Sequence, residues 1–216
     1  MPHAELTTAA VVALVVAAAC ALANWWSVSV GRRPVEWVTK PAVMVALVVA
    51  ALVVHPTDGA VRAWVVAGLV CSLAGDVFLM LPRERFVEGL VSFLAAHVAY
   101  IVAFLIAGSS STGAAIGVVV VVVGVTFMAR PILRSVQADH PAFAMPVLAY
   151  VSIISVMVVA AWASANPWAI VGAMSFYVSD GTLAWNKFVK PIRGGRFAIM
   201  STYHLAQFAI VVSLAR

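Results

Sequence analysis

Hydrophobic residues form long stretches along this chain, and short polar segments separate them. A helix of about 20 apolar residues crosses the hydrocarbon core of a bilayer. Eight stretches fit such a helix, and they cover residues 7–30, 40–55, 61–81, 87–107, 113–130, 142–163, 167–187 and 196–215. The pattern predicts an all-α polytopic membrane helix bundle. Because no connecting segment is long enough to fold by itself, we expect residues 1–216 to form a single integral membrane domain.

Residues that favour turns and helix ends agree with these spans. Pro41 and Pro167 are expected at helix starts, where a missing N–H costs little. The valine run at 118–123 carries no polar group and is expected to face lipid or to pack as filler. Cys20 and Cys71 both fall inside spans, so we expect no disulfide.

The composition supports a membrane protein, because 64% of the 216 residues are hydrophobic and only 10% are charged. A soluble globular domain is about one quarter charged. The loops after the first, third, fifth and seventh spans hold eleven of the 13 Lys and Arg residues, and Arg62 and Arg216 are the other two. The positive-inside rule therefore predicts that these loops are cytoplasmic and that both termini are not. The membrane itself is expected to be of the bacterial inner or plasma type.

The net charge of +5 is explained by this topology and by contact with anionic membrane lipids. Nucleic-acid binding would need a basic domain, which the chain lacks. The oligomeric state is not predicted.

Two aspartates, Asp76 and Asp180, interrupt the hydrophobic stretches. An Asp near the middle of a membrane helix costs roughly 2.5–3.5 kcal/mol on insertion scales, so each must face a polar cavity. The two are 104 residues apart, and each precedes a basic loop and a helix with His and Tyr, namely His97 with Tyr100 and Tyr203 with His204. This spacing suggests a 4 + 4 parallel internal repeat.

Depth in the membrane connects these polar residues. Asp76, Asp180 and Tyr203 each lie seven residues from a basic residue at the cytoplasmic boundary, which places them roughly 10 Å inside it. His97 and Tyr100 are expected slightly deeper, and Tyr203 shares a helix face with Arg196, Met200 and Gln207. The sequence therefore predicts one inward-facing polar pocket near the cytoplasmic side.

Each of these residues also has a purely structural interpretation. The aspartates could bond helices together, and His97 could simply satisfy a neighbouring backbone group. Tyr100, Tyr203 and Gln207 could contact a substrate or only support residues that do, whereas His204 is expected to point away. The basic residues of the last cytoplasmic loop most simply set the orientation. A metal site of two Asp and two His is conceivable, but these residues are scattered singly over four helices, so we predict neither a metal nor a cofactor.

Five short motifs follow one another from the second span to the last: TKP at 39–41, LAGDVFLM at 73–80, FLAAHVAY at 93–100, VSDGTLA at 178–184 and TYHLAQ at 202–207. In this order and spacing they resemble the motifs of the YhhN-like lysoplasmalogenase family. The resemblance implies an eight-helix membrane enzyme whose lysophospholipid substrate is a lysoplasmalogen, lysoplasmenyl-ethanolamine or -choline. Hydrolysis of the vinyl ether bond would release a fatty aldehyde and a glycerophospho-base.

The polar residues suit that chemistry, which needs one acid and one base. Two carboxyl groups in a pocket of low dielectric can divide these roles, because one of the pair stays protonated near neutral pH. We expect Asp76 and Asp180 to be the catalytic pair, without assigning the acid. His97, Tyr100, Tyr203 and Gln207 are expected to position water and the glycerol backbone. The residues expected near the phosphate or headgroup are Lys40, Asn186 and Arg196.

Two other functions fit the same residues. A proton-coupled transporter or lipid carrier would use Asp76 and Asp180 to bind protons, but alternating access favours a site at the membrane midplane with polar routes to both faces. A structural or signalling membrane protein would need the aspartates for stability rather than for turnover.

Overall fold

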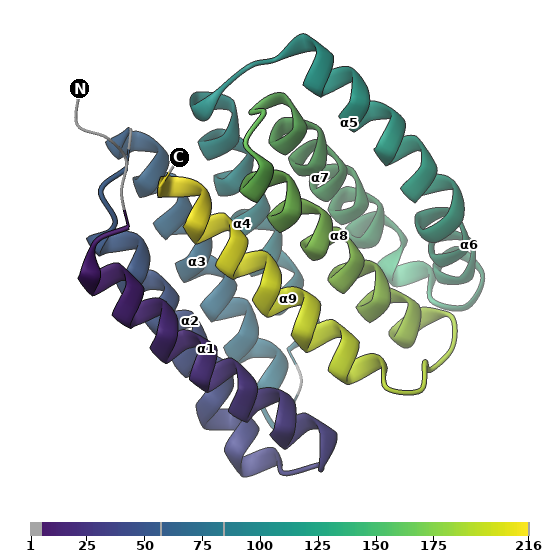
Figure 1. Cartoon of the computed structure of the whole chain (residues 1–216). Coiled ribbons are helices and arrows are strands. Elements are labelled where there is room, and N and C mark those ends of the chain that lie inside the picture. Colours follow the sequence, from purple (N-terminus) through teal and green to yellow (C-terminus); the bar gives the residue numbers. More distant parts are fainter. Residues whose placement is uncertain (1–5, 57, 84, 216) are drawn as a thin grey trace.

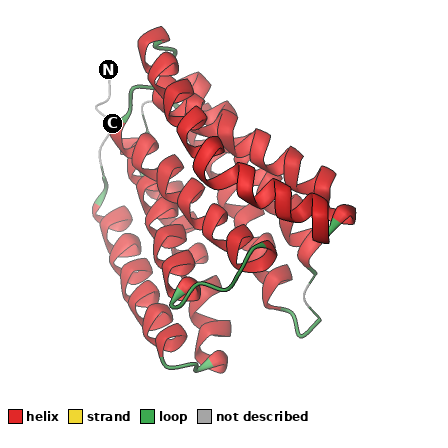
Figure 2. Cartoon of the chain, turned by 90° about the vertical axis from the view of Figure 1, so that its right-hand side faces the viewer, coloured by secondary structure: helices red, strands yellow, loops and turns green. Residues whose placement is uncertain are grey.

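The computed structural model describes residues 6–56, 58–83 and 85–215, and within these ranges the chain consists of helices joined by short loops (Figures 1 and 2). The helices are α1 (Thr8–Ser29), α2 (Arg33–Val53), α3 (Gly59–Met80), α4 (Phe86–Ala107), α5 (Ser111–Gly124), the π-helix η1 (Val125–Ala129), α6 (Arg130–Asp139), the short η2 (Pro141–Phe143), α7 (Ala144–Ala163), α8 (Pro167–Phe188), α9 (Gly195–Val212) and η3 (Ser213–Ala215). Because α5, η1 and α6 form one continuous helical segment, the described chain has the eight long helices that the hydrophobic pattern predicts.

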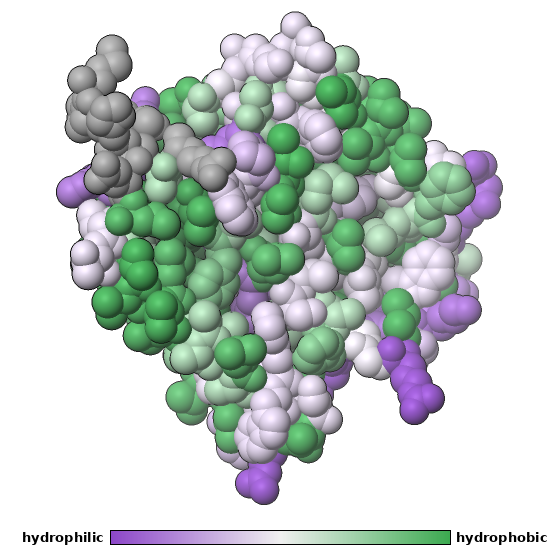
Figure 3. All heavy atoms as spheres, viewed as in Figure 1, coloured by the Kyte–Doolittle hydropathy of each residue, from purple (hydrophilic) through white to green (hydrophobic). Residues whose placement is uncertain are grey.

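Seven of these long helices are apolar enough to cross a membrane. The eighth is α8, which carries Asp180, Asn186 and Lys187 and packs against α7 and α9. The face shown in Figure 3 is hydrophobic or neutral over most of its area, and hydrophilic side chains gather along its lower and right-hand rim. The protein is therefore an integral membrane protein built as a helical bundle.

The long helices pack as neighbouring pairs. α1 packs against α2 and α3 against α4 in the first half, and α5 packs against α7 and α8 against α9 in the second (Figure 1). The halves meet where α4 contacts α7 and where α9 contacts α1 and α2. This correspondence between the halves favours the 4 + 4 repeat, which stays a prediction.

The expected start of the second span is wrong. α2 begins at Arg33, with Pro34 in its first turn, and Pro41 lies inside the helix rather than at its start. The hydrophobic run begins only at residue 40, so the more polar first two turns carried no hydrophobic signal. Lys40 consequently lies within a membrane helix and is buried. Pro167 does begin α8, where Asn166 accepts hydrogen bonds from the N–H groups of Trp168 and Ala169.

The fifth span is longer than expected, because the helix continues through η1 and α6 to Asp139 instead of ending near residue 130. Its valine run faces outward at Val118, Val119, Val122 and Val123, as expected for contact with lipid. Gly117 lies on the opposite, α7-facing side and is buried. Cys20 and Cys71 are free thiols within α1 and α3.

Candidate active site

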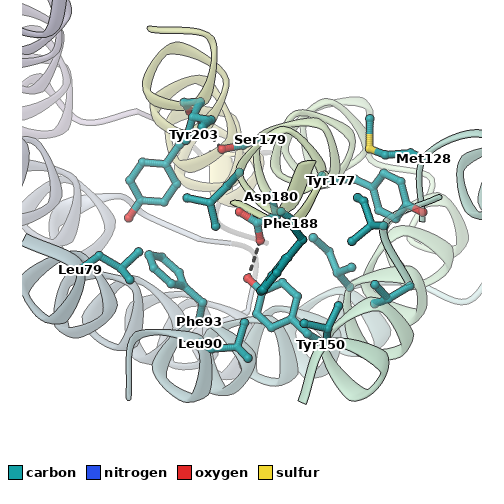
Figure 4. Close-up of a pocket in the computed structure, with 18 of the residues that line it drawn as sticks. Leu79, Leu90, Phe93, Met128, Tyr150, Tyr177, Ser179, Asp180, Phe188 and Tyr203 are labelled. Atoms are coloured by element: carbon teal, nitrogen blue, oxygen red, sulfur yellow. Dashed lines mark hydrogen bonds between the residues drawn. The ribbon is translucent and has the colours of Figure 1, made fainter. Parts of the chain in front are cut away.

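A pocket of about 890 Å³, a volume that includes its open mouth, lies between the two halves of the bundle. Most of its wall is apolar, with side chains such as Leu79, Leu90 and Phe93 on one side and Met128 on the other (Figure 4). Its polar lining includes Lys40, Asp76, Tyr150, Tyr177, Ser179, Asp180 and Tyr203. The structure thus brings Asp76 and Asp180 to one pocket, although they come from α3 and α8.

Asp76 is buried, and both of its carboxylate oxygens have a partner. Lys40 Nζ lies 2.9 Å from Oδ1, and the Tyr203 hydroxyl donates a 2.7 Å hydrogen bond to Oδ2. The same hydroxyl lies 3.3 Å from Met44 Sδ. Helices α2, α3 and α9 therefore meet at this carboxylate, and the lysine supplies a neutralising charge inside the bundle.

Asp180 has different surroundings. Its side chain is 18% exposed, and the Tyr150 hydroxyl donates a hydrogen bond to Oδ2 (Figure 4). His97 Nε2 lies 3.6 Å from the same oxygen, which is longer than a hydrogen bond. In the described part of the chain no donor contacts Oδ1, and no Lys or Arg pairs with this carboxyl. The two aspartates consequently share a pocket but differ in partners and in access.

His97 lies behind Asp180 rather than on the pocket wall. Its ring packs edge-on against Tyr150, with centroids 5.2 Å apart, and against Phe176 at 4.6 Å. The side chain is fully buried. His97 therefore does not contact the pocket itself but contacts two residues that line it, Asp180 and Tyr150.

Tyr100 and Gln207 also lie away from the pocket wall, and they bond to each other. The Tyr100 hydroxyl donates to Gln207 Oε1 over 2.7 Å, and both side chains are buried. Of the predicted stripe on the last helix, only Met200 and Tyr203 line the pocket. The Tyr100–Gln207 contact joins α4 to α9, so we assign this pair to helix packing.

Arg196 and Asn186 lie near the rim of the pocket, and both side chains have hydrogen-bond partners within the protein. Arg196 is about half exposed and makes two hydrogen bonds, of 2.9 and 2.8 Å, to the carboxylate of Glu36. Asn186 Oδ1 accepts a 2.6 Å hydrogen bond from the N–H of Ile192 in the α8–α9 loop. Neither residue lines the pocket. Their contacts instead fasten α2 to α9 and shape the loop between α8 and α9.

His204 points away from the pocket, as expected, and its Nδ1 accepts a 3.0 Å hydrogen bond from Trp25 Nε1 of α1. Within the described ranges no group of three His, Cys, Asp or Glu side chains is placed to hold a metal ion.

Sequence reasoning missed three polar residues of the pocket lining, Tyr150, Tyr177 and Ser179, and of these Tyr150 contacts Asp180. Tyr150 lies in α7, far in sequence from every Asp and His of the predicted layer, so no spacing argument reached it. The available signal was its depth. Tyr150 is six residues inside α7, close to the depth predicted for the two aspartates. A tyrosine hydroxyl at that depth needs a hydrogen-bond partner within the protein.

Comparison with known proteins identifies the family. The YhhN family model matches residues 35–214. Lysoplasmalogenase TMEM86B of Mus musculus is 32% identical over 161 residues, which is 73% of this chain and 66% of that protein. Lysoplasmalogenase TMEM86A of Bos taurus is 36% identical over 175 residues, 75% of this chain and 68% of that protein. Membrane protein YhhN of Escherichia coli O157:H7 is 26% identical over 209 residues, 91% of this chain and 96% of that protein.

No solved structure matches the chain. The aligned region spans slightly less than two thirds of the TMEM86B proteins, 66% in mouse and 62% in human. The family model, in contrast, covers nearly the whole sequence from α2 to η3. The chain belongs to the YhhN family.

Proposed function

We propose that this protein is a lysoplasmalogenase, which hydrolyses the vinyl ether bond of a lysoplasmenyl-ethanolamine or -choline lipid to a fatty aldehyde and a glycerophospho-base. The observation that carries the proposal is the placement of Asp76 and Asp180, with unlike partners, in one apolar pocket of a membrane protein. The names of the mammalian relatives support the same activity.

Vinyl ether hydrolysis proceeds through a cation. Protonation of the β-carbon creates an oxocarbenium ion at the α-carbon, and water then adds to give a hemiacetal that collapses to aldehyde and alcohol. The reaction therefore needs a group that delivers a proton to carbon and a negative charge beside the developing cation. Two carboxyl groups in different electrostatic surroundings can supply these separately.

The contacts favour Asp180 as the acid. Its Oδ1 has no described donor, so this oxygen can carry a proton and present it to a bound substrate. Asp76 fits the other role, because its Oδ1 forms an ion pair with the Lys40 ammonium and its Oδ2 accepts the hydrogen bond from Tyr203. In this proposal Asp76 stays a carboxylate that stabilises the cation and orients the water. The proton that the water loses restores Asp180.

The apolar wall fits the hydrocarbon chain of the substrate. Leu79, Leu90, Phe93 and Ile154 line the pocket without offering a hydrogen bond. The predicted orientation places the headgroup at the cytoplasmic rim, near the basic α8–α9 loop that contains Lys190 and Arg193. In this arrangement Lys40 neutralises the charge of Asp76 and does not bind the phosphate.

The test is aldehyde release by detergent-purified protein given lysoplasmenyl-ethanolamine, with the matching 1-alkyl and 1-acyl lysolipids as controls. We expect aldehyde from the vinyl ether alone, and a loss of about 100-fold or more in Asp76→Asn and Asp180→Asn. Glu88→Gln, which alters an exposed carboxylate beside Arg85, is the matched control and should keep wild-type turnover.

Gel filtration checks that each variant is folded. If Asp76→Asn alone does not fold, the double variant Lys40→Met with Asp76→Asn tests the same carboxylate without leaving a buried lysine unpaired. Folded wild-type protein that releases no aldehyde would overturn the proposal and favour a transporter or lipid carrier.

A further inference from the structure

Tyr150 of α7 touches the reacting carboxyl of the proposed mechanism. Its ring lines the pocket and is buried, and its hydroxyl donates to Asp180 Oδ2. Figure 4 shows the two side chains pointing toward one another from opposite sides of the pocket. The hydroxyl thus occupies one carboxyl oxygen and leaves the other toward the pocket.

His97 lies against the same oxygen. Its Nε2 is 3.6 Å from Asp180 Oδ2, and its ring stands nearly perpendicular to that of Tyr150. Phe176 packs on His97 with a 4.6 Å centroid distance, so the imidazole has little freedom to turn. Asp180 Oδ2 is therefore enclosed by protein groups, whereas no donor in the described part of the chain contacts Asp180 Oδ1.

This asymmetry matters because the terminal torsion of an Asp side chain is broad and roughly two-fold. A carboxyl without a fixed partner could present either oxygen or turn its proton away from the substrate. Proton transfer needs the donor within about 2.6–3.2 Å of its target, and a misplacement of about 1 Å can cost about 100-fold in rate. A tyrosine hydroxyl fixed on one oxygen selects the other.

We propose that Tyr150 is the positioning residue of the acid: by holding Asp180 Oδ2 against His97, it directs Oδ1 and its proton at the β-carbon of the vinyl ether. The role rests on the proposed lysoplasmalogenase activity. Tyr203 likewise donates a hydrogen bond to Asp76, but Lys40 also fixes that carboxylate. Among the described residues Asp180 has no such second partner, so its orientation depends more strongly on Tyr150.

The test compares Tyr150→Phe with Tyr100→Phe in the aldehyde-release assay. Each variant removes one buried hydroxyl that donates one hydrogen bond, but the bond of Tyr100 goes to Gln207 and not to a carboxyl. We expect Tyr150→Phe to lower kcat about 10- to 100-fold with KM changed less than about 3-fold. Tyr100→Phe should keep kcat within about 3-fold of wild type.

A double-mutant cycle separates positioning from general support. If Tyr150 acts through Asp180, adding Tyr150→Phe to Asp180→Asn lowers the residual rate no further. Equal losses in both backgrounds, or an unchanged kcat in Tyr150→Phe, would overturn the role while wild-type aldehyde release leaves the proposed activity intact.

An infrared measurement tests the same contact without turnover. The difference spectrum between wild type and Asp180→Asn isolates the carboxyl band of Asp180, and Tyr150→Phe should shift that band while Tyr100→Phe does not. A band unmoved by Tyr150→Phe contradicts the positioning role even for a protein that proves inactive on vinyl ethers.

Discussion

Lys40 and Asp76 form an ion pair inside the membrane bundle, with Nζ 2.9 Å from Oδ1 and side chains that are only 5% and 1% exposed. Each charge alone would be costly at this depth. Together, and with the hydrogen bond from Tyr203, they leave neither carboxylate oxygen without a partner. The pair explains how α3 carries an aspartate in a hydrophobic stretch, and it ties α2 to α3 beside the pocket.

Removing the lysine should therefore destabilise the protein strongly. In Lys40→Met the Asp76 carboxylate loses its counter-charge, and breaking a buried pair in this way costs about 3–5 kcal/mol. The measurement is thermal unfolding in detergent. Adding Asp76→Asn to Lys40→Met should recover a large part of the loss, because no unpaired charge then remains.

The Arg196–Glu36 pair at the rim is the matched control. The Arg196 side chain is 54% exposed and that of Glu36 is 12% exposed, so water reaches this pair through the arginine, and exposed pairs contribute about 0–1 kcal/mol. Arg196→Gln should therefore change the free energy of unfolding by no more than about 1 kcal/mol. If Lys40→Met lowers the free energy of unfolding no more than Arg196→Gln does, the buried pair does not stabilise the protein as its geometry suggests.

The sequence predicted those parts of the site that depend on depth. A fixed rise per residue places Asp76, Asp180 and Tyr203 at one level of the membrane, and the structure brings all three to one pocket. The partners of these residues could not be predicted in the same way. Which side chain contacts each oxygen of a carboxylate depends on the rotation of the helix and on its neighbours. Both are properties of the packed bundle.

Lys40 and Tyr150 illustrate the two ways in which partners were missed. Lys40 was expected near a phosphate because the hydrophobic run begins beside it, whereas α2 starts two turns earlier and carries the lysine inward. Tyr150 was missed because α7 has no charged residue along its length to draw attention to it. The fold class follows from hydrophobic length, but the chemistry of the pocket follows from contacts between helices.

The contact between α5 and α7 depends on small residues. A Cβ atom added at Gly117 would lie 3.0 Å from Val159 Cα, and one added at Gly113 would meet the carbonyl oxygen of Trp162. Backbone atoms cannot move aside cheaply, and the spacing of these glycines is the small-xxx-small pattern of close membrane helices. Gly113→Ala should therefore lower the free energy of unfolding by about 1–3 kcal/mol.

Gly59→Ala is the control for that substitution, because an added Cβ there meets no atom within 4 Å. Thermal unfolding in detergent should leave Gly59→Ala at or above the wild-type midpoint. Equal midpoints for Gly113→Ala and Gly59→Ala would show that α5 can move away from α7 without loss.

Membrane orientation is open to a direct chemical test. The positive-inside rule predicts that the α8–α9 loop is cytoplasmic and that the α2–α3 loop is not. In a variant whose Cys20 and Cys71 are replaced by alanine, a membrane-impermeant thiol reagent added to intact cells should label Asp58→Cys and spare Lys190→Cys. Labelling in the reverse order would place the pocket mouth on the non-cytoplasmic side, and the headgroup with it. Arg216, which also entered the charge count, lies outside the described residues.

Gly181 sets the width of the pocket beside Asp180. A Cβ atom added there would collide with Met128 Sδ and would lie 3.1 Å from its Cγ. Met128 belongs to η1, lines the pocket and has a flexible side chain, so the collision should turn it into the space proposed for the substrate. In the aldehyde-release assay Gly181→Ala should raise KM about 3- to 10-fold with little change in kcat, because binding rather than proton transfer is obstructed. Adding Met128→Ala removes the colliding atoms and should restore KM. If KM stays high in the double variant, or if kcat falls instead of KM rising, Met128 does not form the substrate-facing wall beside Asp180.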